Sequence, residues 1–170
     1  MVAMQSLLAK MLLILVLSVA SWSCVGAEKD VKIKSVKTDV SDGNSAVESW
    51  TTSLSNNQID TEIKVKENCP PMIQAEIRLI KDGIIVNKFV QNMDQPFEIV
   101  KSQNLCNSVD TQEPDDKSCS AVEGEHRLSE CDLSSWFSDL DDGDYTGECD
   151  IKSNNKIIST ATMEVEVREK

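Results

Sequence analysis

Residues 72–90, MIQAEIRLIKDGIIVNKFV, carry the pattern that decides the fold. From Ile73 to Leu79, apolar side chains alternate with polar ones, and a period of two places the apolar groups on one face of a β-strand. Asp82-Gly83 follows, a pair typical of tight hairpin turns because glycine tolerates a positive φ angle. The return segment 84–90 is rich in β-branched and aromatic residues, which favour strands. The stretch therefore predicts an antiparallel hairpin.

A second hairpin is predicted near the end of the chain. The same alternation runs from Tyr145 to Ile151 and from Ala161 to Val167, and the polar residues 153–156 separate the two runs. The polar segment 41–57 is predicted to be a loop, and 131–140 to contain one short helical turn. Weaker strand signals lie at 31–36, 59–65, 97–100 and 125–128.

This series of short strands predicts the fold class. Seven or eight antiparallel strands, each with one apolar face, indicate an all-β, immunoglobulin-like sandwich of two antiparallel sheets. The same pattern argues against a parallel sheet, because the strands of such a sheet are buried on both faces.

The first 27 residues have the pattern of a signal peptide. Lys10 precedes an apolar run over 11–20, and the small residues Val25 and Ala27 stand where a signal peptidase cleaves. The run is well short of the roughly 20 residues that cross a bilayer, so no membrane span is expected. We expect cleavage after Ala27 and a single secreted, extracellular domain over 28–170, with the lysosomal lumen as an alternative location.

Charge and cysteine content narrow the function further. The chain has a net charge of −12, which opposes binding to nucleic acid. In an oxidising compartment, the five cysteines left after cleavage should form two bridges and leave one thiol. The polar segment 107–118 favours a bridge that closes it, Cys106–Cys119, but the connectivity is otherwise open. The candidates are Cys69, Cys106, Cys119, Cys131 and Cys149.

No catalytic, metal or cofactor site is predicted. The only histidine, His126, lies in the charged stretch 123–127 and is expected to be an exposed surface residue. No nucleophile motif or Cys-x-x-Cys pair accompanies it. The cysteines lack the short spacing of zinc ligands, and the acidic run 138–144 lacks the spacing of a calcium loop, so a solvated turn is expected there. The protein is therefore not predicted to be an enzyme.

Short motifs resemble the ML (MD-2-related lipid-recognition) domain family, and among its members the lysosomal ganglioside activator. Residues 132–136, DLSSW, and 143–145, GDY, followed by a polar turn and a last apolar strand, are similar to the C-terminal end of that family. The first predicted strand and the segment 67–71, ENCPP, are further likenesses. The family's usual cysteines near the mature N-terminus and in the last strand are missing here, so the bridge pattern should differ.

The resemblance implies a non-enzymatic protein that holds a lipid or another hydrophobic small molecule between two sheets, in a space lined by inward apolar side chains. Ordinary core packing is the alternative for each of them. The second function hypothesis is a secreted sandwich with a filled core that binds a protein receptor, as an immune, salivary or venom-type factor. The candidate cavity residues are Ile77, Leu79, Ile85, Phe89, Trp136, Ile151, Met163 and Val165.

Overall fold

The computed structural model describes residues 28–43, 46–66, 73–92, 100–111 and 121–170. These residues form nine strands, a short 3-10 helix, η1 (Ser134–Trp136), and a helical segment over 100–102. The strands are β1 (Lys29–Val40), β2 (Val47–Ser55), β3 (Gln58–Val65), β4 (Ile73–Lys81), β5 (Ile84–Asn92), β6 (Cys106–Asp110), β7 (Gly124–Cys131), β8 (Gly143–Ser153) and β9 (Lys156–Glu169).

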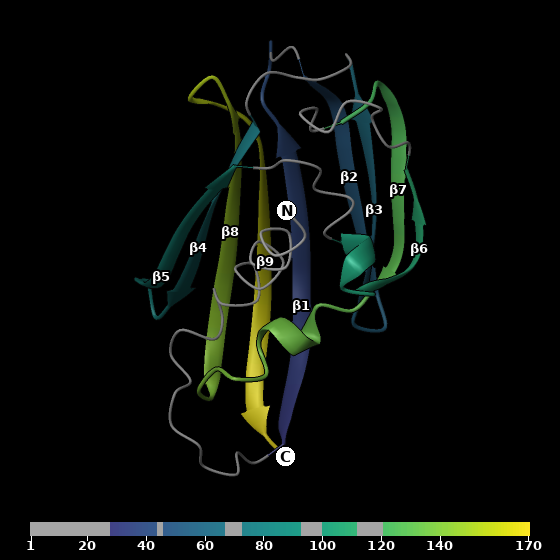
Figure 1. The fold of residues 1–170 in the computed structure, drawn as a ribbon. Coiled ribbons are helices and arrows are strands. Elements are labelled where there is room, and N and C mark those ends of the chain that lie inside the picture. Colours follow the sequence, from purple (N-terminus) through teal and green to yellow (C-terminus); the bar gives the residue numbers. More distant parts are fainter. Residues whose placement is uncertain (1–27, 44–45, 67–72, 93–99, 112–120) are drawn as a thin grey trace, which may run out of the picture.

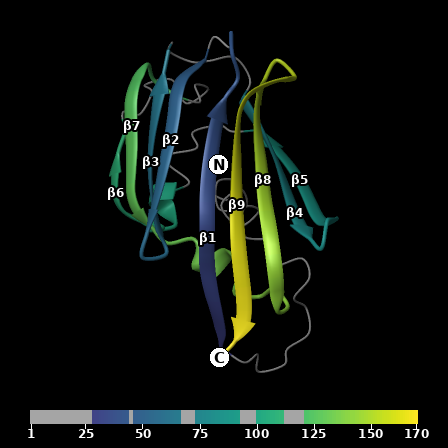
Figure 2. The same cartoon turned by 180° about the vertical axis from the view of Figure 1, so that it is seen from behind.

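The strands form two sheets in which every neighbouring pair is antiparallel. One sheet has five strands in the order β1-β9-β8-β4-β5, and the other has four in the order β2-β3-β7-β6. Figures 1 and 2 show β1 at the edge of its sheet, beside β2 of the other sheet. The predicted all-β sandwich of two antiparallel sheets with a disulfide bond is confirmed, with nine strands among the described residues in place of seven or eight. The bond lies within the four-stranded sheet.

Both predicted hairpins are confirmed. In the β4–β5 turn, φ is +53° at Asp82 and +75° at Gly83, the left-handed geometry that matches the twist of the flanking strands. The β8–β9 turn has the same geometry at Asn154 and Asn155. Asparagine tolerates this region better than other side chains because its amide can bond locally to the backbone.

The prediction that 41–57 is a loop is wrong. It contains β2, which pairs with β3 through a turn at Asn56 and Asn57, both with positive φ. The segment has no apolar alternation, so periodicity missed it. The strand forms because neighbouring strands bond to it. The indole N–H of Trp50 donates to Thr61 Oγ1 of β3 at 2.8 Å, and the backbone carbonyl of Trp50 accepts from Thr38 Oγ1 of β1.

Two other predictions fail around β6. Residues 107–110, which were expected in a loop, pair with β7. The predicted strand 97–100 does not include Val100, which is helical, and 97–99 lie outside the described residues. Three weaker strand predictions are confirmed: 31–36 lies in β1, 59–65 in β3 and 125–128 in β7. The helical turn predicted within 131–140 is confirmed as η1.

The N-terminal prediction cannot be matched to a structure, because residues 1–27 lie outside the described ranges. In the ranges that are described, no helix has the length and apolar character that crossing a membrane requires.

The core lies between the two sheets, and β1 and β9 supply much of it. One buried cluster, formed by Val31, Phe137, Tyr145, Val165 and Val167, packs against Trp136 of η1. The second joins Ile33 of β1 to Ile59, Leu128 and Cys131 of the four-stranded sheet. The third contains Ala46, Val47 and Ile158. The five-stranded sheet therefore has an inner face, which packs on the other sheet, and an outer face.

Candidate functional site

The strand register places a row of apolar side chains on the inner face of β5, β4 and β8. Phe89 is opposite Ile77, and Ile77 is opposite Cys149. Leu79 lies two residues after Ile77 on β4, and Ile151 lies two residues after Cys149 on β8. Both share the inner face, because side chains two residues apart in a strand point the same way. We call these five residues the inner patch: Ile77, Leu79, Phe89, Cys149 and Ile151.

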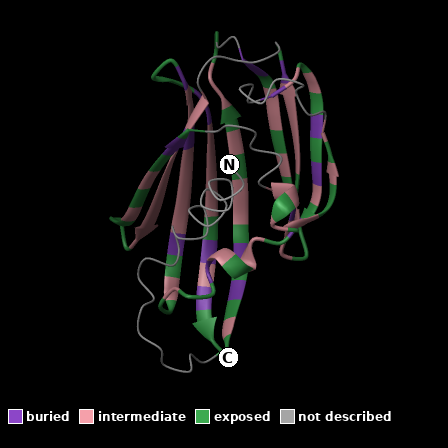
Figure 3. Ribbon diagram, viewed as in Figure 1, coloured by how far each residue is buried: buried purple, intermediate pink, exposed green. Residues whose placement is uncertain are grey.

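Burial changes across this inner face. At β1 and β9 the side chains are closed off from solvent: Ile33 is 4% exposed and Val165 1%. The members of the inner patch are all only partly buried. Among the described residues, Ile77, Phe89 and Cys149 belong to none of the three buried clusters, whereas Leu79 and Ile151 pack on the margins of two of them. The strand β4 is partly exposed along nearly its whole length (Figure 3).

The arrangement of the sheets accounts for this gradient. The two sheets lie close together along β1 and β2, while β4 and β5 splay away from β6 and β7 (Figure 1). Asn57, in the β2–β3 turn, holds the closed side. Its side-chain oxygen accepts from the N–H of Ile33 at 2.6 Å, and its amide nitrogen donates to the carbonyl of Val31 and to Ser134 Oγ, each at 3.0 Å. Sequence reasoning missed this residue, which resembles any turn asparagine.

The predicted cavity residues separate into three groups. Ile77, Leu79, Phe89 and Ile151 lie together in the inner patch. Val165 is a core residue, and Met163 and Trp136 are partly buried against the core clusters. Ile85 is 53% exposed and lies opposite Ile80, on the outer face. A bulge at Val86 adds one residue to β5 and reverses the alternation of its side chains beyond that point. The period-two pattern that starts at Phe89 therefore predicts the inner face for Ile85, whereas its side chain lies on the outer face.

The outer face behind the inner patch carries a balanced ion network. Glu76 of β4 pairs with Lys152 of β8 at 2.7 Å and with Lys88 of β5 at 2.8 Å. Arg78 of β4 pairs with Asp150 of β8 at 2.8 Å, with Glu148 at 3.0 Å and with Glu76 at 3.1 Å. These bonds tie the three strands together from the outside.

His126 is buried, and the prediction of an exposed histidine is wrong. Its side chain is 1% exposed, and Nε2 donates to the carbonyl of Val122 at 2.7 Å. The prediction of an exposed side chain rested on the charged residues on either side of His126. Glu125 and Arg127 point outward, where Arg127 pairs with Glu62 of β3 at 2.9 Å, and the strand alternation turns His126 inward. In the described part of the chain, no group of three or more histidine, cysteine, aspartate or glutamate residues could hold a metal ion.

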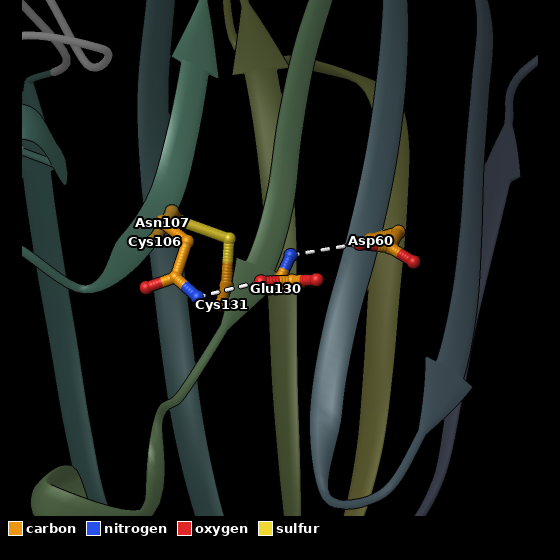
Figure 4. The surroundings of a disulfide bond; sticks show 5 residues. All are labelled: Asp60, Cys106, Asn107, Glu130 and Cys131. Atoms are coloured by element: carbon orange, nitrogen blue, oxygen red, sulfur yellow. Dashed lines mark hydrogen bonds between the residues drawn. A yellow bond between two sulfur atoms is a disulfide. The ribbon is translucent and has the colours of Figure 1, made fainter.

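The observed disulfide joins Cys106 of β6 to Cys131 of β7, so the predicted Cys106–Cys119 bridge is wrong. The two cysteines are direct partners across the β6–β7 ladder. A prediction that places 107–110 in a loop contains no such ladder and therefore does not bring these two cysteines together. Figure 4 shows the neighbouring bulge: Glu130 has φ +53°, its N–H donates to Asp60 Oδ1 at 2.7 Å, and its carboxylate accepts from the Asn107 amide at 2.6 Å. Cys69 and Cys119 lie outside the described residues.

Cys149 is a free thiol within the inner patch. Burial raises its pKa to about 12, and the neighbouring Asp150 carboxylate acts in the same direction. The thiol is therefore protonated at neutral pH and behaves as a small apolar group. The inner patch thus carries no charged side chain.

These features define a two-sheet antiparallel β-sandwich that is packed along one side and has a partly exposed, uncharged apolar patch on its inner face. No protein-family model matches the sequence, and no curated protein is similar to it. Among solved structures, the chain is similar to the crystal structure of chicken MD-1 complexed with lipid IVa, with a TM-score of 0.39 and 11% identity. The match covers 82% of this chain and 98% of the MD-1 chain.

Proposed function

We propose that this protein is a non-enzymatic carrier that holds a lipid or another hydrophobic small molecule between its two sheets, against the inner patch. One observation carries the proposal: on the inner face of β4, β5 and β8, the apolar side chains of Ile77, Phe89 and Cys149 stay partly exposed and outside the core clusters. Apolar surface costs about 25 cal/mol for each Å² left in water, so an apolar ligand that covers the patch gains free energy.

The chemistry of the patch limits the kind of ligand. Aliphatic, aromatic and protonated thiol groups offer no ion pair to a charged headgroup. Most charges of these strands lie on the outer face, where Glu76 and Arg78 are engaged with their neighbours. The exception is Lys81 at the end of β4, whose ammonium donates to the Tyr145 hydroxyl at 3.2 Å and to the carbonyl of Asp142 at 2.8 Å. The part of the ligand that contacts the patch is therefore an acyl chain, a ring system or a similar apolar body, and any polar headgroup lies away from it.

Two adjacent residues of β5 provide the test. Phe89 faces the inner patch, and Val90 lies on the outer face opposite Glu76, 46% exposed. Displacement of a fluorescent fatty acid should show binding by the unmodified protein. We expect Phe89→Asn to weaken that binding by about tenfold or more, because it places an amide against the apolar ligand. Val90→Asn is the matched control and should bind as the unmodified protein does.

Two results would overturn the proposal. One is the failure of any apolar ligand to bind in a one-to-one ratio. The other is equal weakening by Phe89→Asn and Val90→Asn. Either result, together with native mass spectra that show no retained lipid, would favour the second candidate, a sandwich that binds a protein receptor.

We also propose that the carrier works outside the cytosol. The Cys106–Cys131 bridge supports an oxidising compartment, because such bonds persist mainly in secreted and luminal proteins. Residues 1–27 would then be removed as a signal peptide and 28–170 would form the working domain. N-terminal sequencing of the protein released by secreting cells should begin at Glu28, and recovery of a chain that retains residues 1–27 would contradict the proposal.

A further inference from the structure

The exposed apolar side chains of this protein are concentrated on one strand. Among the described residues, five large apolar side chains are strongly exposed, and four of them belong to β5. They are Ile84 (68%), Ile85 (53%), Val86 (51%) and Val90 (46%), whereas the fifth, Ile157 (44%), is on β9. The strand β5 is the last in the order of its sheet, so its outer side has no strand beside it within the described chain.

The other sheet edges are protected in ways that natural proteins use against edge-to-edge pairing. Alternating lysines occupy β1, among them Lys32 and Lys34, and β1 and β2 lie beside each other. The edge strand β6 is only five residues long and ends in Asp110. The edge strand β5 has a bulge at Val86, but it is nine residues long and carries a single charged side chain, Lys88, whose ammonium lies 2.8 Å from the Glu76 carboxylate.

Charge also distinguishes this edge from the rest of the chain. The whole chain has a net charge of −12, which opposes the approach of a second copy over most of its surface. The sequence of β5, IIVNKFVQN, contains no acidic residue. Next to it, Lys81 at the end of β4 and Asp82 in the turn carry charges that cancel. An identical strand can therefore approach β5 without meeting the repulsion that the acidic surface produces elsewhere.

We propose that β5 is a self-association edge at which a second copy of this chain pairs, antiparallel and about a two-fold axis. In such a dimer, the backbone groups along the edge of β5 in one copy form hydrogen bonds with those of β5 in the other copy. The pairing joins two five-stranded sheets into one continuous sheet, and cross-strand contacts between the two copies cover part of the exposed apolar side chains of β5. This association is independent of ligand binding.

The test compares two substitutions of equal chemistry and similar exposure. Sedimentation velocity of the full secreted chain, over a wide range of protein concentration, should show a monomer that converts to a dimer. Val90→Lys, on β5, should raise the dimer dissociation constant by about tenfold or more, because it places charge at the seam. Ile157→Lys, on the interior strand β9, should leave that constant unchanged.

Salt provides a second readout. Because the two copies carry net charge of the same sign, raising the ionic strength should tighten the dimer. If Val90→Lys does not fold by circular dichroism, Ile85→Lys replaces it, since Ile85 is also exposed on β5. A protein that stays monomeric at every concentration overturns the proposal, as does an Ile157→Lys variant that dissociates like Val90→Lys. Monomeric protein that sediments with neutral phosphatidylcholine vesicles, and loses this ability in Val90→Lys, assigns the edge to a lipid surface instead.

Discussion

Cys149 shows how the environment of one residue determines its chemistry. It lies opposite Ile77 on one side and Ala161 on the other, so its thiol faces apolar neighbours. With a pKa raised to about 12, almost no thiolate exists at neutral pH, although the thiolate is the reactive form. The odd cysteine expected from the sequence is thus an inert part of the inner patch in the folded protein.

We expect Cys149 to react slowly with maleimide at pH 7 in the folded protein and rapidly after unfolding in guanidinium. The folded state withholds the thiol in two ways, by burial and by the raised pKa. Mass spectrometry of tryptic peptides after timed labelling measures the ratio of the two rates. Similar rates in the folded and unfolded chains would contradict the partial burial and the raised pKa of this thiol.

At the scale of the strands, the outer-face ion network supports β4, β5 and β8. Hydrogen bonds from Lys152 and then Lys88 lower the pKa of Glu76 from 4.5 to about 2. A carboxylate whose pKa is lower in the folded than in the unfolded state stabilises the fold above its unfolded pKa. That contribution is lost as the pH falls from about 4.5 through about 2.

Glu76→Gln should therefore destabilise the protein at pH 7, and its difference from the unmodified protein should shrink as the pH falls from about 4.5 to about 2. Urea denaturation at pH 7 and at low pH gives the two differences. Glu62→Gln is the control, because the Glu62–Arg127 pair is exposed and contributes little. A Glu76→Gln effect that is the same at both pH values would contradict the role given to the network.

At the scale of the whole molecule, the sandwich is packed unequally. The buried clusters centre on β1 and β9 and draw further members from β2, β3, β7 and β8. On this side, Asn57 bonds both to the backbone of β1 and to η1. The side formed by β4 and β5 has a partly exposed interior. The stability of the protein should therefore reside in the first side, and the second is free to serve binding.

Core truncations test this division. Val165→Ala removes two methyl groups from a side chain that is 1% exposed, and should lower the free energy of unfolding by about 2 kcal/mol. Ile77→Ala removes more atoms, yet it should cost less, because Ile77 is partly exposed and lies outside the buried clusters. Denaturant unfolding of both variants decides the order, and a larger loss for Ile77→Ala would show that the β4–β5 side is packed.

Much of the architecture could be predicted from the chain because it depends on local patterns. Alternation over 73–79 and 161–167, with Asp82-Gly83 at one turn, predicted both long hairpins, and one-faced strands predicted two antiparallel sheets. These signals act between near neighbours in the sequence. They identified Ile77 and Phe89 as inward-facing without revealing whether anything packs against them.

The remaining features depend on partners that are distant in the sequence. The strands β2 and β6 lack apolar alternation and form because β3 and β7 lie beside them, and the pairing of β6 with β7 in turn brings Cys106 to Cys131. His126 is buried by the direction of its strand, although its neighbours are charged. The sequence by itself determined the hairpins, the two-sheet fold and the apolar character of the inner face. Only the tertiary structure decided which part of that face is closed, because burial depends on how far apart the two sheets stand.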